Sequence, residues 1–208
     1  MSNSIRETFG LELVKLGYSN DKILAISADL KGATKLIEFF KASPVRSFEV
    51  GISEANAIGI AAGLGLSGFK PVIASFGSFL TGKNVEIRTS IAFNKSPVLI
   101  VGTHGGLIGP DGPTQAGLQD VAVMRSMPNM KVFQPATHIE TGKILEYCVK
   151  QNEPIYLRIS RQQTKEFFND TYKFSEGEPV VVNNNFSNVL IFPSGNELER
   201  SIEASHQL

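Results

Sequence analysis

The sequence predicts a three-layer α/β/α domain built on a mostly parallel β-sheet. Short, mostly apolar segments typical of strands alternate with helix-length segments from residue 5 to about residue 160. Such an alternation needs crossover connections, and these cover both faces of a parallel sheet with helices. The chain has 208 residues, of which 42% are hydrophobic and 19% charged, so it can also bury a sizeable core.

The first half of the chain contains three strand–helix repeats. Apolar residues with the spacing of one helical face open the chain, at Ile5, Phe9, Leu13 and Leu16. The next expected elements are strand 22–26, helix 34–41, strand 47–50, the Ala- and Gly-rich helix 55–66, strand 71–74 and helix 80–93. Glycines and polar residues separate these segments, as turns require.

The second half repeats the pattern around a glycine- and proline-rich loop at 104–112. The most apolar strand, 97–101, precedes this loop. The elements expected after the loop are helix 118–127, strand 131–133, helix 140–150 and strand 154–159. The domain expected from all these segments spans residues 5–165.

The composition changes after Arg161, where residues 166–186 are polar and predict a linker. A strand at 188–192 and a helix at 196–208 are expected after it. One strand and one helix cannot bury a core of their own. Residues 187–208 are therefore interpreted as the start of a second, truncated domain.

Charge and cysteine content exclude several classes of protein. Twenty basic and twenty acidic side chains cancel, so no basic excess indicates binding to nucleic acid or to an anionic membrane. One cysteine, Cys148, excludes an internal disulfide framework and a cysteine-rich metal site. The longest uncharged apolar run, 57–66, is far shorter than a membrane span, and the N-terminus lacks the layout of a signal peptide. We expect a cytoplasmic protein.

Ligands of an open parallel sheet bind beyond the carboxyl ends of its strands. The residues expected along this edge are Ser27, Asp29, Glu54, Phe76, Phe79, His104, Asp111 and Arg161. Glu54 opens a helix whose other residues are nearly all small or apolar. It is either a first-turn carboxylate that complements the helix dipole or a carboxyl group in apolar surroundings suited to proton transfer.

The other edge residues also have two interpretations each. Phe76 and Phe79 share a helix face, so they either pack in the core or stack on a flat heteroaromatic ring. His104 and Asp111 lie on the glycine-shaped loop, where they are either solvated or bind a ligand. Arg161 either forms a surface ion pair or binds an anion at a strand end. The loop is not a phosphate loop, because no Gly-Lys-Ser/Thr ends it.

Eight short segments occur together in one order. They are Ser-Ala-Asp-Leu at 27–30, Gly-Ile-Ser-Glu at 51–54, Ala-Ala-Gly-Leu at 61–64, Ser-Phe-Gly-Ser-Phe at 75–79, Thr-His at 103–104, Asp-Gly-Pro-Thr at 111–114, Met-Arg-Ser-Met-Pro-Asn at 124–129 and Ser-Arg at 160–161. In this order they resemble the pyrimidine-binding domain of the transketolase family, particularly the separately encoded C-terminal subunit of split transketolases. Deoxyxylulose-phosphate synthases and the beta subunits of 2-oxo-acid dehydrogenases share part of the pattern. The Asp-Gly-Pro-Thr and Ser-Arg segments favour the transketolase branch.

The resemblance implies thiamine diphosphate as the cofactor. Glu54 matches the glutamate that hydrogen-bonds N1′ of the aminopyrimidine and so promotes removal of the proton from C2 of the thiazolium. Phe76 and Phe79 match the aromatic residues that stack on the pyrimidine, and Asp29 looks like a residue near the thiazolium. The cofactor serves as the electron sink while a two-carbon ketol unit passes from a ketose phosphate to an aldose phosphate.

The same resemblance assigns the substrate contacts. His104 and Asp111 match residues that contact donor hydroxyls, with His104 also expected as a catalytic group beside Glu54, and Arg161 matches the sugar-phosphate clamp. Gln115 stands where the family usually has histidine. An amide can donate and accept hydrogen bonds there, but it cannot carry the proton of an imidazole.

Two further points follow from the family pattern. Its phosphate-binding serine aligns with Ala33, and the neighbouring Thr34 could partly substitute. The family holds the diphosphate through Mg²⁺ on a Gly-Asp-Gly motif in a separate domain, whereas Asp111-Gly112 follows Pro110 on the substrate loop. The resemblance therefore implies that an N-terminal partner subunit supplies the Mg²⁺ ligands, in a homodimeric or α2β2 assembly.

The function expected from the sequence is the pyrimidine-binding half of a split transketolase of pentose phosphate metabolism, incomplete on its own. One alternative is a related thiamine-diphosphate enzyme that resembles deoxyxylulose-phosphate synthase or a 2-oxo-acid dehydrogenase beta subunit. Another is a catalytically dead, truncated paralogue that only binds its partner subunit.

Overall fold

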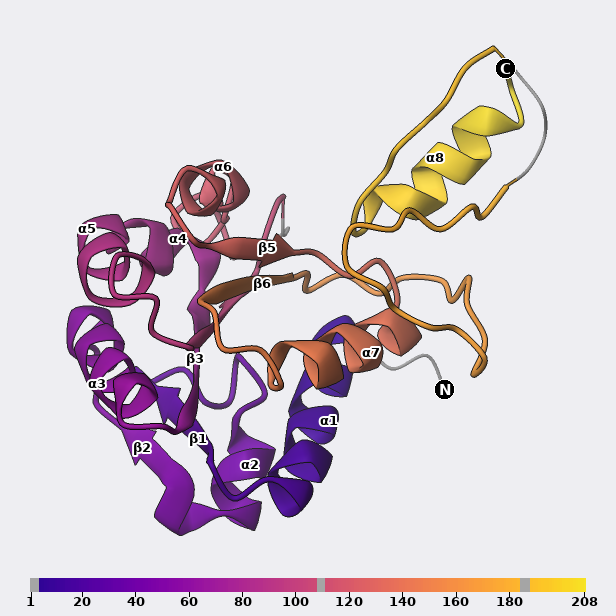
Figure 1. The fold of residues 1–208 in the computed structure, drawn as a ribbon. Helices are drawn as coiled ribbons and strands as arrows, with labels where there is room; N and C mark the ends of the chain where they lie inside the picture. The colour runs from indigo at the N-terminus through magenta and orange to yellow at the C-terminus, as the bar shows by residue number, and fades with distance from the viewer. Residues whose placement is uncertain (1–3, 108–110, 184–187) are drawn as a thin grey trace.

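The computed structural model describes residues 4–107, 111–183 and 188–208. Its centre is a six-stranded, all-parallel sheet with the strand order β2-β1-β3-β4-β6-β5 (Figure 1). The strands are β1 (Ile23–Ser27), β2 (Ser47–Glu49), β3 (Lys70–Phe76), β4 (Leu99–Thr103), β5 (Lys131–Phe133) and β6 (Ile155–Ile159). The expected α/β/α fold with a parallel sheet is confirmed.

Helices cover both faces of this sheet (Figure 1). One face is covered by α1 (Ile5–Ser19), α2 (Ile37–Ala42) and α7 (His138–Cys148). The other is covered by α3 (Glu54–Leu66), the π-helical η2 (Ile87–Ala92) and α6 (Asp120–Arg125). The short 3-10 helix η1 (Pro44–Arg46) leads into β2. These layers place the amino ends of several helices near the edge where the strands end.

Neighbouring residues of each central strand enter opposite hydrophobic cores. Val72 and Leu157 pack under α1, α2 and α7, whereas Ile73 and Tyr156 pack under α3, η2 and α6. Successive side chains of a strand point to opposite faces of the sheet, so a strand that is covered on both sides is apolar throughout. This explains why the central strands are continuous apolar runs in the sequence.

The single helix expected at 80–93 is wrong. The segment contains α4 (Gly77–Thr81), α5 (Asn84–Glu86) and η2 instead. Gly82 ends α4, and Lys83 leaves the helical region with φ −114° and ψ 30°. Glycine loses more backbone freedom in a helix than other residues do, so a break at this point is cheap.

The strand expected at 188–192 is also wrong. Residues in this stretch follow no regular structure, and Leu190 and Phe192 are 81% and 78% exposed. A strand is stable only beside another strand, and the six-stranded sheet does not extend to this segment. The helix expected after it forms as α8 (Glu197–Ser205), which stands apart from the sheet in Figure 1.

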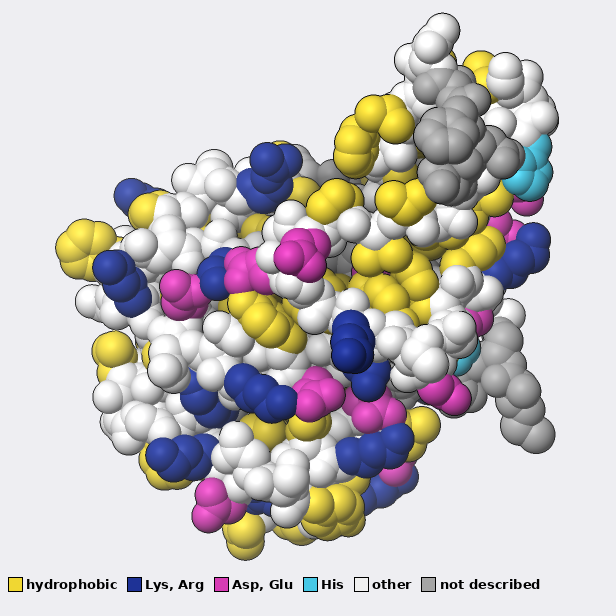
Figure 2. All heavy atoms as spheres, turned by 45° about the vertical axis from the view of Figure 1, so that its right-hand side comes forward, with side chains coloured by type: hydrophobic (Ala, Val, Ile, Leu, Met, Phe, Trp, Pro, Cys, Tyr) yellow, Lys and Arg dark blue, Asp and Glu magenta, His cyan; other side chains and the backbone are white. Residues whose placement is uncertain are grey.

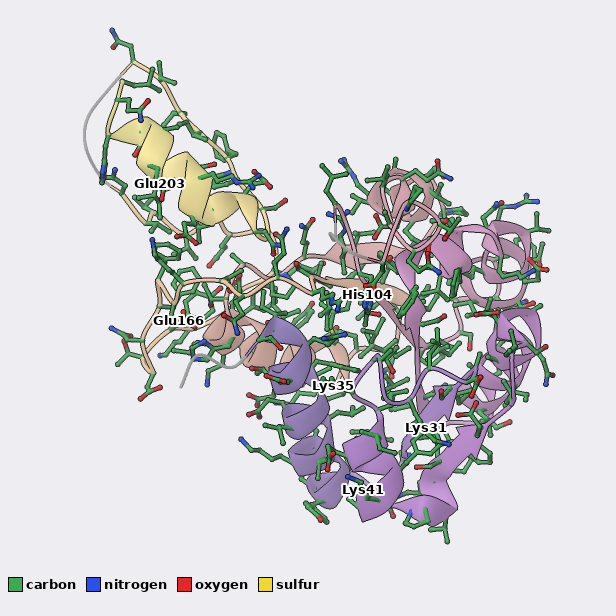
Figure 3. All side chains as sticks on the ribbon, turned by 180° about the vertical axis from the view of Figure 1, so that it is seen from behind. Lys31, Lys35, Lys41, His104, Glu166 and Glu203 are labelled. Atoms are coloured by element: carbon green, nitrogen blue, oxygen red, sulfur yellow. The ribbon has the colours of Figure 1, made fainter. Side chains whose placement is uncertain are left out.

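The described residues 164–183 contain no helix or strand, but they lie against the domain. Glu166 accepts a hydrogen bond from the Ile139 amide at 3.0 Å at the start of α7, and it is labelled beside that helix in Figure 3. Phe174 packs edge-on against Phe133 and Tyr147. Figure 2 shows hydrophobic side chains gathered between the body of the domain and the C-terminal segment that carries α8. Charges of both signs are mixed over the same face.

The boundaries of the linker and of the second domain remain predictions. Residues 108–110 of the glycine-rich loop and 184–187 of the linker lie outside the described residues. In the part of the chain that is described, no helix has the length and apolar character needed to cross a membrane.

Candidate active site

The carboxyl ends of the central strands bring together residues that are far apart in the sequence. In the sheet register, Phe76 at the end of β3 pairs with Thr103 of β4, and Thr103 pairs with Ile159 of β6. His104 follows Thr103, and Arg161 lies two residues after Ile159. The parallel register alone therefore places three of the candidate residues at one edge.

An aromatic stack forms the centre of this edge. The Phe76 and Phe79 rings are 5.2 Å apart and nearly parallel, at 28°. The His104 ring lies against Phe76, with the ring centroids 4.0 Å apart. Phe76 is buried between its two neighbours, whereas Phe79 on α4 is partly exposed. Phe79 therefore offers the accessible ring of the stack.

Hydrogen bonds fix the tautomer of His104. The Thr103 hydroxyl donates to the Ser75 carbonyl at 3.2 Å, so it can only accept from the imidazole Nδ1, 3.0 Å away. The Nε2 atom then carries the lone pair and faces the Arg6 guanidinium at 3.5 Å. Figure 3 shows His104 inside the ribbon, surrounded by side chains from several elements.

Burial and two arginines keep this imidazole neutral. Only 2% of His104 is exposed. Burial, and then the positive charges of Arg6 and Arg161, lower the pKa of His104 from 6.5 to about 4. The backbone of His104 also has a left-handed φ of 58°, a strained conformation for a residue with a side chain. The protein therefore holds a neutral, oriented imidazole at the end of β4.

Two arginines and an aspartate surround His104. Arg161 forms an ion pair with Asp111, and Asp111 lies 3.8 Å from His104 Nε2. Arg6 donates to the Ala33 carbonyl at 2.8 Å. Burial and the nearby charge of Arg161 lower the pKa of Arg6. These contacts place two cationic groups on the same side of the imidazole, which is an arrangement suited to an anion.

Arg6 is the residue that the sequence reasoning missed. It lies near the start of α1, outside the strand ends, and the helical periodicity of that segment says nothing about its polar positions. Gly10 on the same helix allows the close approach of the Lys35 backbone, which a Cβ would block. This packing brings the 30–36 segment and Arg6 together at the edge of the sheet.

Glu54 is the first residue of α3 and is hydrogen-bonded to the end of β3. Its Oε1 accepts a hydrogen bond from the Ser75 hydroxyl at 3.3 Å, and Ser75 precedes Phe76. The side chain is partly exposed, so a ligand can reach it. Both sequence interpretations of Glu54 remain compatible with this position: the carboxylate lies in the first turn of a helix and is hydrogen-bonded to the strand that ends in Phe76.

Asp29 follows β1, which is two strands away from β4, the strand that leads into His104. Asp29 has a left-handed φ of 58°, is exposed, and is held through its backbone amide, which donates to Glu49 Oε1 at 2.6 Å. Thr34 is fully buried, and its hydroxyl donates to the Leu30 carbonyl at 2.9 Å. The Thr34 hydroxyl is thus used inside the turn, and its partial substitution for a phosphate-binding serine stays a prediction.

Gln115 follows the glycine-rich loop by three residues. Its carbonyl accepts from the Ser78 hydroxyl at 3.1 Å, and its side chain accepts from Thr114. The loop is thereby joined to α4, which carries Phe79. Within residues 4–107, 111–183 and 188–208, no group of three or more His, Cys, Asp or Glu is placed to hold a metal ion.

A family described as the transketolase pyrimidine binding domain matches residues 2–166 of this chain. The chain belongs to this family. The resemblance inferred from the eight short segments is thus confirmed, and transketolase-family enzymes of this kind depend on thiamine diphosphate. A solved split-gene transketolase, described as an inactive beta4 tetramer, superposes with a TM-score of 0.89 at 36% identity, covering 100% of this chain and 68% of that one.

Two curated relatives fall in different branches of the transketolase family. A putative transketolase C-terminal section from Methanocaldococcus jannaschii is 31% identical over 210 residues, which cover 98% of this chain and 66% of that protein. A 1-deoxy-D-xylulose-5-phosphate synthase from Clostridium acetobutylicum is 39% identical over 152 residues, which cover 73% of this chain and 25% of that protein. The chain therefore spans between a quarter and about two thirds of these relatives' own length.

Proposed function

We propose that this chain is the pyrimidine-binding part of a transketolase that transfers a two-carbon ketol unit from a ketose phosphate to an aldose phosphate. The proposal rests on the Phe76–Phe79 stack together with the Glu54 carboxylate, which is hydrogen-bonded to Ser75, the residue before Phe76. A flat aromatic face and an adjacent carboxylate are the two features that an aminopyrimidine needs for stacking and for a hydrogen bond to its ring nitrogen.

The described residues fit the pyrimidine end of thiamine diphosphate. The partly exposed ring of Phe79 would stack on the pyrimidine, and Glu54 would hold a proton at N1′ through a hydrogen bond. The bound cofactor would supply the electron sink for cleavage of the C2–C3 bond of the ketose. We propose that a partner subunit with a Gly-Asp-Gly motif supplies the ligands for the diphosphate and Mg²⁺.

The groups around His104 fit a phosphorylated sugar. A neutral imidazole with its lone pair on Nε2 accepts a hydrogen bond from a donor hydroxyl at pH 7, and it needs no deprotonation first. Arg6 and Arg161 provide two positive charges for the phosphate. Because Asp111 pairs with Arg161, the phosphate would compete with that carboxylate, which would then be free to contact sugar hydroxyls.

Two other functions compete with this one. The identity to 1-deoxy-D-xylulose-5-phosphate synthases favours a related enzyme with a 2-oxo acid as donor. The neighbour described as an inactive beta4 tetramer favours a chain that assembles without catalysis on its own. The choice of donor separates the first alternative from a transketolase, and activity after reconstitution separates the second.

The test is reconstitution with a Gly-Asp-Gly subunit from the same organism, in thiamine diphosphate and Mg²⁺. The proposal predicts ketol transfer from a ketose phosphate to an aldose phosphate, and no transfer from pyruvate, a 2-oxo acid that carries no ketol group. Glu38→Gln changes a partly exposed carboxylate on α2 whose ion-pair partner among the described residues is Lys41, so it serves as a matched control for Glu54→Gln. Turnover that requires pyruvate as the donor, or the absence of turnover with either donor, would overturn the proposal.

A further inference from the structure

A buried polar network lies directly beneath the candidate active site. Asp120, the first residue of α6, is fully buried. Its Oδ2 accepts from the Tyr156 hydroxyl at 2.7 Å and from Arg158 Nε at 3.0 Å. Tyr156 and Arg158 are neighbouring polar positions of β6, on the face of the sheet that α6 covers. None of these three residues is among the candidate site residues discussed above.

The network reaches His104 through a short series of contacts. Arg158 Nη2 donates to the Gly117 carbonyl at 2.9 Å. The Gly117 amide in turn donates to the His104 carbonyl at 3.1 Å, and the Gly106 amide donates to the Gly117 carbonyl at 2.9 Å. One guanidinium therefore ties the buried carboxylate to Gly117, which pairs with Gly106 and His104 at the start of the glycine-rich loop.

Glycines allow these segments to approach the network. A Cβ on Gly105 would lie 2.8 Å from Arg158 Cγ, and a Cβ on Gly77 would lie 3.1 Å from both Asp120 Oδ2 and the Tyr156 hydroxyl oxygen. Gly77 is the residue between Phe76 and the rest of α4. The base of the loop and the start of the aromatic segment therefore both rest on the same three side chains.

Such a network contributes more to the orientation of the groups it binds than to the free energy of unfolding. Desolvation of two buried charges offsets most of their attraction, so an apolar replacement of similar shape is often as stable. Among the described residues, Asp120 Oδ1 has no hydrogen-bond partner, which adds to the cost of burying this carboxylate. What the pair does provide is geometry, because the planar guanidinium binds the carboxylate and the Gly117 carbonyl in fixed directions.

We propose that Asp120 and Arg158 are positioning residues, which fix residues 104–107 and Gly117 so that His104 is held against Phe76 in its buried, strained conformation. The catalytic consequence rests on the proposed function, since it assumes that His104 binds the donor. The positioning itself is a property of this chain and can be measured without turnover. A failed activity assay would therefore refute the function and leave the positioning to its own test.

The experiment compares loop dynamics and the His104 titration by NMR in the complete chain. Arg158→Lys keeps the positive charge but cannot reach both the carboxylate and the Gly117 carbonyl. Tyr156→Phe removes one hydrogen bond to the same carboxylate and leaves the Arg158–Gly117 contact intact. Thr141→Val removes a buried hydroxyl on α7, on the opposite face of the sheet, and controls for a general loss of stability.

The proposal predicts a specific response of the loop to Arg158→Lys. Amides of 105–107 and 115–117 should exchange at least tenfold faster than in the wild type, relative to amides of α1. The pKa of His104 should rise from about 4 by one unit or more, toward 6.5. In Tyr156→Phe and Thr141→Val, the exchange of these amides should follow the global stability, and the His104 pKa should stay within half a unit of the wild type.

Two outcomes would overturn the proposal. One is a folded Arg158→Lys variant with wild-type loop exchange and His104 titration. The other is an equal change of loop exchange and His104 pKa in Tyr156→Phe and Thr141→Val, since general destabilisation would then explain both readouts. If Arg158→Lys does not fold, the double variant Asp120→Asn/Arg158→Met, which buries no unpaired charge, provides the same two readouts with the same expectations.

Discussion

Mild acid should destabilise this chain through His104. Burial beside Arg6 and Arg161 lowers the pKa of its imidazole from 6.5 to about 4 in the folded chain. The unfolded chain binds the proton with the ordinary pKa. Because the folded pKa is the lower of the two, the stability that comes from the neutral imidazole is fully present above pH 6.5. It is lost progressively as the pH falls toward 4.

The two pKa values set the size of the effect. A lowering from 6.5 to about 4 corresponds to about 3 kcal/mol of unfolding free energy when the imidazole is protonated in both states. Between pH 7 and pH 4.5, the linkage relation predicts a loss of about 2 kcal/mol through this residue. His104 is 2% exposed, so solvent screens the effect little.

The assay is urea unfolding of the wild type and of His104→Asn at pH 7, 6, 5 and 4.5, at low protein concentration. Asparagine stays neutral across this range, so the variant should lack the contribution of residue 104. The carboxylates and the other two histidines are common to both proteins and cancel in the difference. The wild type should lose about 2 kcal/mol more than His104→Asn over this range. If the two proteins lose unfolding free energies that agree within about 0.5 kcal/mol over this pH range, the buried, neutral imidazole is refuted.

Three further predictions concern single substitutions. In the reconstituted complex, Glu54→Gln should lower the rate at least about 100-fold, because an amide is a poor proton partner, and a rate within a few-fold of the wild type would count against its role. Arg161→Ala should raise KM for phosphorylated donors by a factor equivalent to about 1.5–3 kcal/mol, and an equal loss with unphosphorylated hydroxypyruvate would indicate structural damage instead. Gly102→Ala should cost about 1–3 kcal/mol in urea unfolding, because an added Cβ would overlap the Tyr156 hydroxyl, and a cost below about 0.5 kcal/mol would contradict this packing.

Local patterns in the sequence were sufficient to predict the parallel sheet and to place several candidate residues at the ends of its strands. Continuous apolar strands separated by helices require a sheet covered on both faces, and the strand ends of such a sheet meet at one edge. Phe76, His104 and Arg161 could therefore be placed together from their positions in the sequence. The stack of Phe76 on His104, and the neutral state of the imidazole, depend on packing that no local pattern describes.

The errors have physical causes that also lie outside local pattern. The polar face of α1 gives no sign that Arg6 reaches His104, because the approach depends on how α1 packs over the 30–36 segment. The helix expected at 80–93 breaks at Gly82. The helical spacing of apolar residues continues past this point, but the backbone leaves the helical conformation at Lys83. Residues 188–192 have the composition of a strand, yet strand formation depends on a neighbour that the sequence of the segment cannot reveal.

The central claim is that this chain supplies the pyrimidine half of a thiamine-diphosphate site and that a partner supplies the diphosphate half. The most direct measurement is calorimetric titration of thiamine diphosphate, with and without Mg²⁺, into the chain alone and into its mixture with the Gly-Asp-Gly subunit. An aromatic stack and one carboxylate support only weak binding, so the chain alone should show no Mg²⁺-dependent affinity, whereas the mixture should. Micromolar, Mg²⁺-dependent binding by the chain alone, or none by the mixture, would contradict the claim.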